Sequence, residues 1–323
     1  MAELDCSYLV PVRWADGADR ASLASYLAEL APRCAETIVV DGSPAEVFAA
    51  NRAAFAPHVT AHLAPDPAAA CLNGKVAGVM TAARRASRQA LVIADDDVRY
   101  EPGELRRALE LLAGADLVRP QNYFDPLPWH ARWDTARSLL NRALGRDFPG
   151  TLAVRRSLLL GAGGYDGDVL FENLELIRTV AAAGGTELAP LDLFVLRLPP
   201  SARHFLSQRV RQAYDDFALP PRMGLWLALV PGLAVAAATR RPRAPLLAAL
   251  AAVALAERGR RRAGGAGVFP PTASLLAPAW LLERGVCSWL AVASRARRGG
   301  VRYAGSTIRR AANSRRRLRR ARR

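Results

Sequence analysis

The stretch Gln89–Tyr100, which reads QALVIADDDVRY, constrains the fold of this chain most strongly. Its apolar run, 90–94, leads directly into three carboxylates, Asp95, Asp96 and Asp97. An apolar run of this length is typical of a strand that is buried on both faces of a parallel sheet. Ligands of such sheets bind beyond the carboxyl ends of the strands, where these three acids are expected.

Two interpretations of the three carboxylates are open from this stretch alone. They could form a solvated acidic turn before a helix that starts near Glu101. Alternatively, they could form a binding site, because adjacent carboxylates repel one another unless a cation or hydrogen-bond donors compensate them. Hard oxygen ligands favour Mg²⁺ or Mn²⁺, which commonly bind substrate phosphates as well.

Strand-like and helix-like segments alternate along the first half of the chain. Strands are expected at 7–13, 37–43, 59–65 and 90–94, and helices at 19–33, 45–56, 73–87, 103–115, 171–184 and 201–217. Alternation of this kind predicts βαβ units and an α/β fold with a mostly parallel sheet. Right-handed crossovers then place the polar strand ends, including Asp41 and Asp95, along one edge of the sheet.

The charge of the chain is distributed unevenly. The net charge is +16, yet residues 1–220 carry 23 Lys and Arg against 27 Asp and Glu, whereas residues 221–323 carry 22 against two. This asymmetry indicates an anionic surface as partner, either lipid or nucleic acid. The four cysteines show no metal-ligand spacing and fit a reducing compartment, and residues 1–10 show no signal peptide.

The basic part of the chain also contains long apolar stretches. Residues 223–239 are uncharged, a second apolar stretch spans 244–256, and a third, 267–294, is interrupted by Glu283 and Arg284. A full membrane span needs about 20 apolar residues. We expect a shallow hairpin or a spanning pair, with the third stretch interfacial or crossing, and a tail from residue 295 that is disordered or lies on anionic headgroups.

Several short motifs follow one another in a recognisable order. They are VPVR, VVDGSP, NGKVAGVMTAARRA, ADDDVRY, FENLEL and QRVRQ. In this order the chain resembles membrane-attached family 2 glycosyltransferases with a GT-A fold, nearest to the branch of ceramide and hopanoid glycosyltransferases. The resemblance covers about residues 5–220 and implies a GT-A domain at 1–220, membrane-associated helices at 221–294 and a basic tail at 295–323.

The resemblance also implies the partners and the location of the protein. It implies an inverting transfer from a nucleotide-diphosphate sugar to a lipid or other membrane-proximal hydroxyl, with Mg²⁺ or Mn²⁺ as cofactor. The expected location is the cell membrane, with an anionic membrane surface as partner and the catalytic domain facing the cytoplasm. Nucleic acid is not an expected partner.

Matched residue by residue, the resemblance implies a donor site and a metal site. The donor site would comprise Pro11, Val12, Arg13, Asp41, Lys75, Gly78, Asp95, Asp96, Gln208, Arg209 and Arg211. Asp95 and Asp97 match the D-x-D pair that holds the cation, with Asp97 as the expected direct ligand. The QRVRQ segment matches the Q-x-x-R-W motif that steadies the diphosphate, although Gln212 replaces the usual Trp.

The catalytic base would come from the FENLEL segment. Asn173 stands where an Asp is usual, and an amide cannot take a proton at neutral pH. The base is therefore Glu172 or Glu175, and we favour Glu172. An acceptor hydroxyl that attacks must lose a proton, and one base without a dedicated acid predicts inversion at the anomeric carbon.

Each of these residues also has an ordinary structural interpretation. Asp41-Gly42 is a common turn signal, and Glu172 and Glu175 could simply complement the helix dipole. Arg209 and Arg211 could be solvated helix charges. The order of the motifs favours the functional interpretation.

Two other function classes remain open from the sequence. Nucleotidyl transfer also uses a sheet edge with acidic metal ligands, but the loop 13–19 lacks the phosphate-binding composition expected of that class. A nucleic-acid-binding protein could use the Arg-rich tail, but its charge follows directly on apolar segments.

Overall fold

The computed structural model describes residues 4–16, 19–303 and 305–321. Predictions that fall on positions 1–3, 17–18, 304 and 322–323, parts of the expected N-terminus, first loop and basic tail, lie outside the described residues. The chain forms two compact units. Unit 1 comprises 1–122, 148–197 and 313–323, and unit 2 comprises 123–147 and 198–312. The predicted division into 1–220, 221–294 and 295–323 stays a prediction.

Unit 1 is built on a seven-stranded sheet in the order β3-β2-β1-β4-β8-β6-β9. The strands are β1 (Leu4–Val12), β2 (Cys34–Asp41), β3 (Ala61–Leu63), β4 (Ala90–Ala94), β6 (Leu117–Val118), β8 (Thr151–Arg155) and β9 (Glu187–Leu188). The first four run parallel, and β8 is antiparallel to β4 and β6. The predicted α/β fold with a mostly parallel sheet is confirmed.

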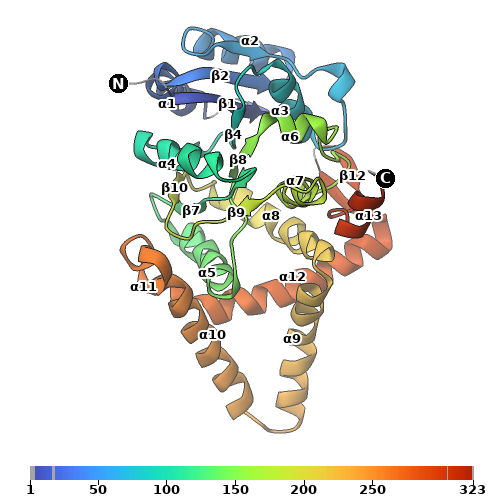
Figure 1. The fold of residues 1–323 in the computed structure, drawn as a ribbon. Helices are drawn as coiled ribbons and strands as arrows, with labels where there is room; N and C mark the ends of the chain where they lie inside the picture. The colour runs from blue at the N-terminus through green and yellow to red at the C-terminus, as the bar shows by residue number, and fades with distance from the viewer. Residues whose placement is uncertain (1–3, 17–18, 304, 322–323) are drawn as a thin grey trace. The chain divides into compact units, whose positions relative to one another are not determined.

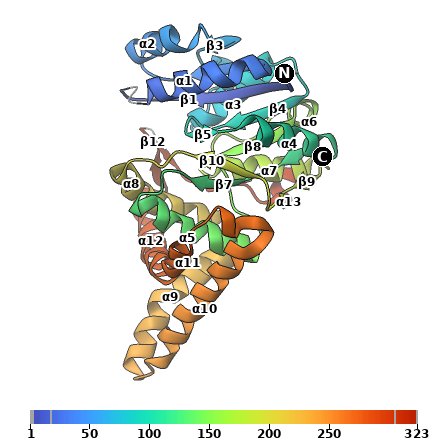
Figure 2. The same ribbon diagram turned by 90° about the vertical axis from the view of Figure 1, so that its left-hand side faces the viewer.

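Helices cover both faces of this sheet (Figures 1 and 2). One face packs against α1 (Arg20–Leu30), α2 (Ala45–Phe55) and α4 (Pro102–Ala113), and the other against α3 (Gly74–Arg85), α6 (Arg156–Gly161) and α7 (Glu172–Ala182). Alternate residues of a strand point to opposite faces. Accordingly, Val92 lies in the first layer, whereas Leu91 and Ile93 lie in the second.

A second sheet in the order β5-β10-β7 follows the acidic stretch. Its strands are β5 (Val98–Arg99), β7 (Gln121–Phe124) and β10 (Phe194–Arg197). Strand β5 begins one residue after Asp97 and pairs antiparallel with β10, with Arg197 opposite Val98. The pairing therefore delivers Arg197 to the acidic end of β4.

Unit 2 is mainly helical. It contains α5 (Trp129–Leu144), α8 (Ala202–Tyr214), α9 (Pro220–Ala238), α10 (Arg243–Arg261), α11 (Pro271–Leu275) and α12 (Ala277–Arg298), followed by the hairpin of β11 (Val301–Tyr303) and β12 (Ser306–Ile308). Gly259 lets α10 cross α5 closely, because a Cβ at that position would collide with the carbonyl oxygen of Leu139. Helices α9 and α10 meet only at their connection, 239–242 (Figure 1).

The expectation of a disordered tail is wrong for the described part. Residues 295–298 end α12, the β11–β12 hairpin follows, and α13 (Arg315–Arg320) is helical. The hairpin buries Val301 and Ile308, Ala311 after it is buried too, and α13 begins at the N-cap residue Ser314, which accepts from the backbone N–H of Arg317. Charge composition alone underestimated this local packing.

Candidate active site

The acidic stretch lies at the carboxyl end of β4, as predicted. Asp95 follows the last residue of the strand, and its backbone N–H donates to the carbonyl of Gly150, 2.9 Å away. A glycine is required at position 150 because the backbone there passes close to the Asp95 side chain. A Cβ on it would lie 2.7 Å from Asp95 Oδ2. The backbone around Gly150 therefore forms one wall beside the first carboxylate.

Two cations stand against the carboxylates. Lys75 Nζ lies 2.6 Å from Asp95 Oδ1 and 2.8 Å from Glu172 Oε1. Arg197 donates from Nε to Asp97 Oδ2 over 2.8 Å and lies 3.5 Å from Asp95 Oδ2. The structure thus brings together three predicted elements, the NGK segment, the acidic stretch and the FENLEL helix, within unit 1. We call Lys75, Asp95, Asp96, Asp97, Glu172 and Arg197 the site cluster.

The electrostatics of the site cluster are unbalanced. It holds four carboxylates against two cations. Burial raises the pKa of Asp96 to about 6, and the neighbouring Asp97 adds to that shift, although Trp14 donates its indole N–H to Asp96. Burial also raises the pKa of Asp97, with Arg197 opposing the shift. For Lys75, burial would lower the pKa, but Asp95 and Glu172 outweigh it, so the pKa is raised.

The donor set fits a divalent cation. Asp97 Oδ1 is buried and has no hydrogen-bond partner, and an orphaned buried oxygen of this kind calls for a missing ligand. Within the three described ranges no three His, Cys, Asp or Glu side chains form a ready-made metal cluster. Independently of that, Mg²⁺ sites commonly combine one or two carboxylates with substrate phosphates and water, and Asp95 and Asp97 are oxygen donors of that kind.

Glu172 and Glu175 lie one turn apart on α7 but in different surroundings. The Glu172 side chain is 15% exposed and reaches Lys75. Glu175 is fully buried, and its two oxygens accept from the backbone N–H and side-chain amide of Asn313, each over 2.7 Å. Asn173 donates to the carbonyl of Pro149. This arrangement favours Glu172 over Glu175 as the group that faces a substrate.

The Asp41 carboxylate is 1% exposed and already engaged. It accepts from the backbone N–H of Ser43 over 2.9 Å and from the Asn51 amide over 2.8 Å, and His62 Nε2 lies 3.3 Å away. Burial opposes ionisation, but the hydrogen bonds from His62, Ser43 and Asn51 outweigh it and lower the pKa of Asp41 to about 2. Its direct contact with a nucleotide remains a prediction.

Pro11 and Gly78 account for the packing of α3 on β1. A Cβ on Gly78 would lie 3.0 Å from Pro11 Cβ, so the glycine permits this close approach. Val12 is buried and its carbonyl accepts from Gly42, which joins the ends of β1 and β2. Arg13 is exposed, and its guanidinium lies beside Gly74 at the start of α3. Of these residues, Arg13 alone carries a charge, and its contact with the donor stays a prediction.

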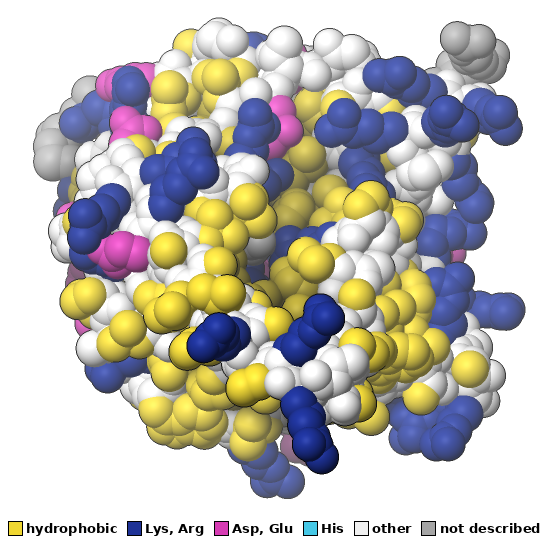
Figure 3. All heavy atoms as spheres, turned by 90° about the horizontal axis from the view of Figure 1, so that it is seen from below, with side chains coloured by type: hydrophobic (Ala, Val, Ile, Leu, Met, Phe, Trp, Pro, Cys, Tyr) yellow, Lys and Arg dark blue, Asp and Glu magenta, His cyan; other side chains and the backbone are white. Residues whose placement is uncertain are grey.

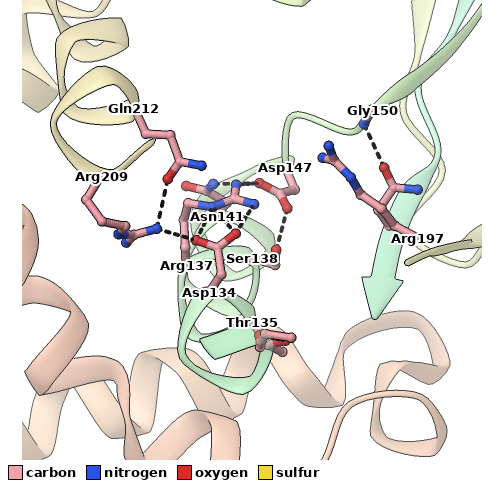
Figure 4. A network of polar contacts seen from close by, with 12 residues as sticks. Asp134, Thr135, Arg137, Ser138, Asn141, Asp147, Gly150, Arg197, Arg209 and Gln212 are labelled. Carbon is pink, nitrogen blue, oxygen red and sulfur yellow. Dashed lines mark hydrogen bonds and ion pairs between the residues drawn. The ribbon is translucent and has the colours of Figure 1, made fainter. Parts of the chain in front are cut away.

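Gln208, Arg209 and Arg211 lie on α8 in unit 2. Arg209 is buried and forms an ion pair with Asp134, 3.0 Å away (Figure 4), and another with Glu283, 2.6 Å away. It also donates to Gln212 over 2.8 Å, so the position where a Trp is usual holds a partner of this arginine. The Arg211 guanidinium lies over the Tyr303 ring.

Three residues of the site were not predicted from sequence: Arg197, Trp14 and Asn313. Arg197 stands in an unremarkable apolar strand, and Trp14 in a loop. The only available signal was the proximity of Trp14 to the predicted VPVR segment. Asn313 sits in an Arg-rich run with no recognisable pattern.

Comparison with known proteins bears on the fold. No protein-family model matches the chain, and no curated protein matches its sequence. A mannosyltransferase from Pyrobaculum calidifontis, solved with GDP-Man and Mn²⁺, is similar over 89% of this chain and 87% of its own, with a TM-score of 0.54 and 20% identity. The chain has the GT-A fold. The fold predicted from the order of the motifs is thereby confirmed.

A weaker likeness exists to a glucosyl-3-phosphoglycerate synthase from Mycobacterium tuberculosis, solved with Mn²⁺, UDP and glucosyl-3-phosphoglycerate. It covers 62% of this chain and 74% of that chain, with a TM-score of 0.42 and 19% identity. The assignment of the fold rests on the mannosyltransferase.

Proposed function

We propose that the protein is an inverting glycosyltransferase that moves a sugar from a nucleotide-diphosphate sugar to a hydroxyl group. The observation that carries this proposal is the site cluster at the carboxyl end of β4 in a GT-A sheet. The similar mannosyltransferase was solved with a nucleotide sugar and Mn²⁺, which supports the same donor class here. Asp97, with its orphaned oxygen, and Asp95 would hold Mg²⁺ or Mn²⁺.

The reaction develops negative charge on the departing diphosphate. A bound divalent cation would stabilise that charge. Lys75 and Arg197 add two positive charges at the same edge of the sheet, and both are held in place by Asp95. Because they are fixed before the substrate arrives, they need no reorganisation during the reaction.

Glu172 is the proposed general base. Its carboxylate lies 2.8 Å from Lys75 Nζ, and the acceptor hydroxyl would take the place of the lysine as its partner. A single base without a partner acid implies single displacement with inversion at the anomeric carbon. Product stereochemistry measured by NMR tests this, and a retained configuration would contradict it.

The remaining donor contacts are also proposed. We propose that Arg13 meets a phosphate or the ribose of the donor, with Pro11, Val12, Asp41 and Gly78 lining the same pocket. Gln208, Arg209 and Arg211 are proposed to steady the diphosphate, although Arg209 already has two carboxylate partners.

We further propose that the acceptor is presented by a membrane. Among the described residues one helix, α9, is long and apolar enough to cross a bilayer by length and composition, and only 11% of its apolar window is buried. Helices α9 and α10 and their connection form a hairpin. Figure 3 shows hydrophobic side chains gathered on the face that this α9–α10 hairpin forms, with Lys and Arg among them. The large hydrophobic residues of α9 and α10 that are exposed are Leu225, Leu233, Val235, Leu246, Leu247 and Leu250.

Helix α12 supports an interfacial position for the third apolar stretch. Leu282, Val286, Trp289 and Leu290 are exposed and share one helical face, whereas Arg284 on the opposite side is buried and lies 3.7 Å from Asp216. A helix with one apolar face and one charged face lies in the membrane interface rather than across it. We therefore propose an in-plane α12 beside the α9–α10 hairpin, with Arg240, Arg241 and Arg243 meeting anionic lipid.

The test of the donor chemistry is a panel of nucleotide sugars with Mn²⁺ or Mg²⁺, assayed with the wild-type chain and with Asp97→Ala. We expect transfer or slow donor hydrolysis with one nucleotide sugar, lost on addition of a chelator and in Asp97→Ala. Activity that persists in both conditions would remove the metal assignment.

The membrane proposal is tested by flotation with vesicles of neutral lipid and of neutral lipid mixed with anionic lipid. Leu282→Glu together with Val286→Glu should abolish flotation. The same change at Leu188, an exposed leucine of β9 in unit 1, is the matched control and should leave flotation intact. Flotation that is equal in all three proteins would contradict the proposed face.

A further inference from the structure

The last described residues of the chain return to unit 1. Residues 313–323 belong to that unit although they follow unit 2 in sequence. Asn313 is 3% exposed, and α13 packs against α7, the helix that begins with Glu172. The chain end therefore lies on the helix that carries the proposed base.

Asn313 binds this helix through both its backbone and its side chain. Its N–H donates to Glu175 Oε2, and its Nδ2 donates to Glu175 Oε1 and to Asp166 Oδ2, each over 2.7 Å. Its carbonyl accepts from Arg178 Nη1, also over 2.7 Å. Glu175 and Arg178 lie three residues apart on one face of α7. Asn313 therefore binds two side chains of this helix and, through Asp166, the loop before it.

The chemistry at this position requires an amide. An Asn side chain has two N–H donors on one nitrogen, and here they meet two carboxylates. Asn313 Oδ1 is buried without a hydrogen-bond partner. The contacts of the side chain are therefore made by its NH₂ group and not by its oxygen. An Asp at 313 would place a third carboxylate beside Asp166 and Glu175, and like charges in a buried site repel strongly.

Glu175 links this contact to the proposed base. It lies three residues after Glu172 on α7 and is fully buried, so it depends on Asn313 for hydrogen bonds that water cannot supply. Without them, the buried carboxylate has lost the donors that offset its removal from water, and α7 must shift to hydrate it. A shift of α7 moves Glu172, which contacts Lys75 from the first turn of the same helix.

We propose that Asn313 is a positioning residue, which holds the first turns of α7 so that Glu172 faces Lys75 and Asp95. This inference rests on the proposed glycosyl transfer only for the role of Glu172. In this proposal the segment that begins at Asn313 supports the active site through α7 and contributes no group to the reaction.

The test compares Asn313→Asp with Ser314→Ala, a matched control that removes the cap of α13 but leaves the Asn313 contacts in place. In Asn313→Asp we expect kcat to fall on the order of 10- to 100-fold with the donor KM unchanged, because a misplaced catalytic group costs about that much. Ser314→Ala should be close to wild type. In the double variant Asn313→Asp with Glu175→Gln, the amide stands at position 175 and the carboxylate at position 313. The two side chains can then hydrogen-bond again, and most of kcat should be recovered.

A second readout does not depend on activity. Hydrogen exchange in the full-length protein should show faster exchange of the α7 amides in Asn313→Asp and wild-type exchange in Ser314→Ala. Unchanged α7 exchange, or an unchanged kcat in a chain whose wild type transfers sugar, would overturn the inference. Absence of transfer in the wild type with faster α7 exchange in the variant would instead contradict the proposed function.

Discussion

Two clusters of carboxylates and cations, one in each unit, have opposite characters. In unit 2, Asp134, Asp147 and Glu283 are paired with Arg137 and Arg209, and every oxygen of these three carboxylates accepts at least one hydrogen bond. Figure 4 shows Asp134 between the two arginines. In the site cluster of unit 1, four carboxylates face two cations, and Asp97 keeps a buried oxygen without a partner.

The pKa directions follow this difference. Burial opposes ionisation of Asp134, but Arg137 and Arg209 outweigh it and lower the pKa of Asp134 below its usual value. The pKa values of Asp96 and Asp97 are raised instead. A cluster in which all oxygens are engaged stabilises the fold. A cluster whose carboxylates are not fully compensated can bind a ligand and is a candidate functional site.

The same substitution in the two clusters should give opposite results. Asp97→Asn removes one negative charge from the site cluster, so we expect transfer to fall on the order of 10³-fold with little change in stability. Asp134→Asn leaves Arg137 and Arg209 short of a partner and should destabilise the protein by about 3–5 kcal/mol. Donor-transfer assays and urea unfolding in detergent measure both, and equal effects of the two substitutions would erase the distinction.

Arg209 separates a structural from a catalytic interpretation of unit 2. Removing it in Arg209→Met leaves Glu283 without its arginine and Asp134 with Arg137 alone, and we expect a loss of about 3–5 kcal/mol in the free energy of unfolding. Arg211→Met, which loses a contact with the Tyr303 ring, should cost less than about 1 kcal/mol. A stable Arg209→Met protein with lost transfer would instead support its predicted contact with the diphosphate.

The stability that the carboxylates of unit 2 contribute should be lost only at low pH. Because the pKa values of Asp134 and Glu283 are lowered in the folded state, their contribution to stability is present above the ordinary carboxyl pKa and is lost as pH falls through the folded value. We expect unit 2 to keep its stability between pH 7 and pH 5 and to lose it below about pH 4.

Tryptophan fluorescence during urea unfolding measures this loss, since every Trp except Trp14 lies in unit 2. A marked loss of stability already between pH 7 and pH 5 would show that the arginines do not control these carboxylates.

The smallest expected effect concerns Gly150. A Cβ there would lie 2.7 Å from Asp95 Oδ2 and 3.2 Å from Arg197 Cζ, so Gly150→Ala should displace the Asp95 carboxylate. We expect Mn²⁺ affinity, measured by electron paramagnetic resonance, to fall about tenfold, the low end of the loss seen when the support of a metal ligand is changed. Gly161→Ala, where a Cβ meets nothing within 4 Å, is the control and should bind Mn²⁺ as the wild type does.

Local sequence was informative wherever the signal lay within one strand or helix. The apolar run before Asp95 determined a buried strand with acids at its carboxyl end, and the N-G-K segment determined a helix start beside it. The sheet then joined them, because parallel strands place their carboxyl ends on one edge. The same reasoning placed Glu172 at the start of a helix.

What the sequence alone determined is therefore the alternation of strands and helices, the GT-A order of motifs and the edge of the sheet where charge collects. Only the tertiary structure decided which charges are compensated. Arg197 reaches Asp97 through a strand pairing, Asn313 engages Glu175 from the far end of the chain, and Arg209 is bound by Glu283. The physical reason is that hydrophobic periodicity is local, whereas the partner of a buried charge is set by which distant segments pack together.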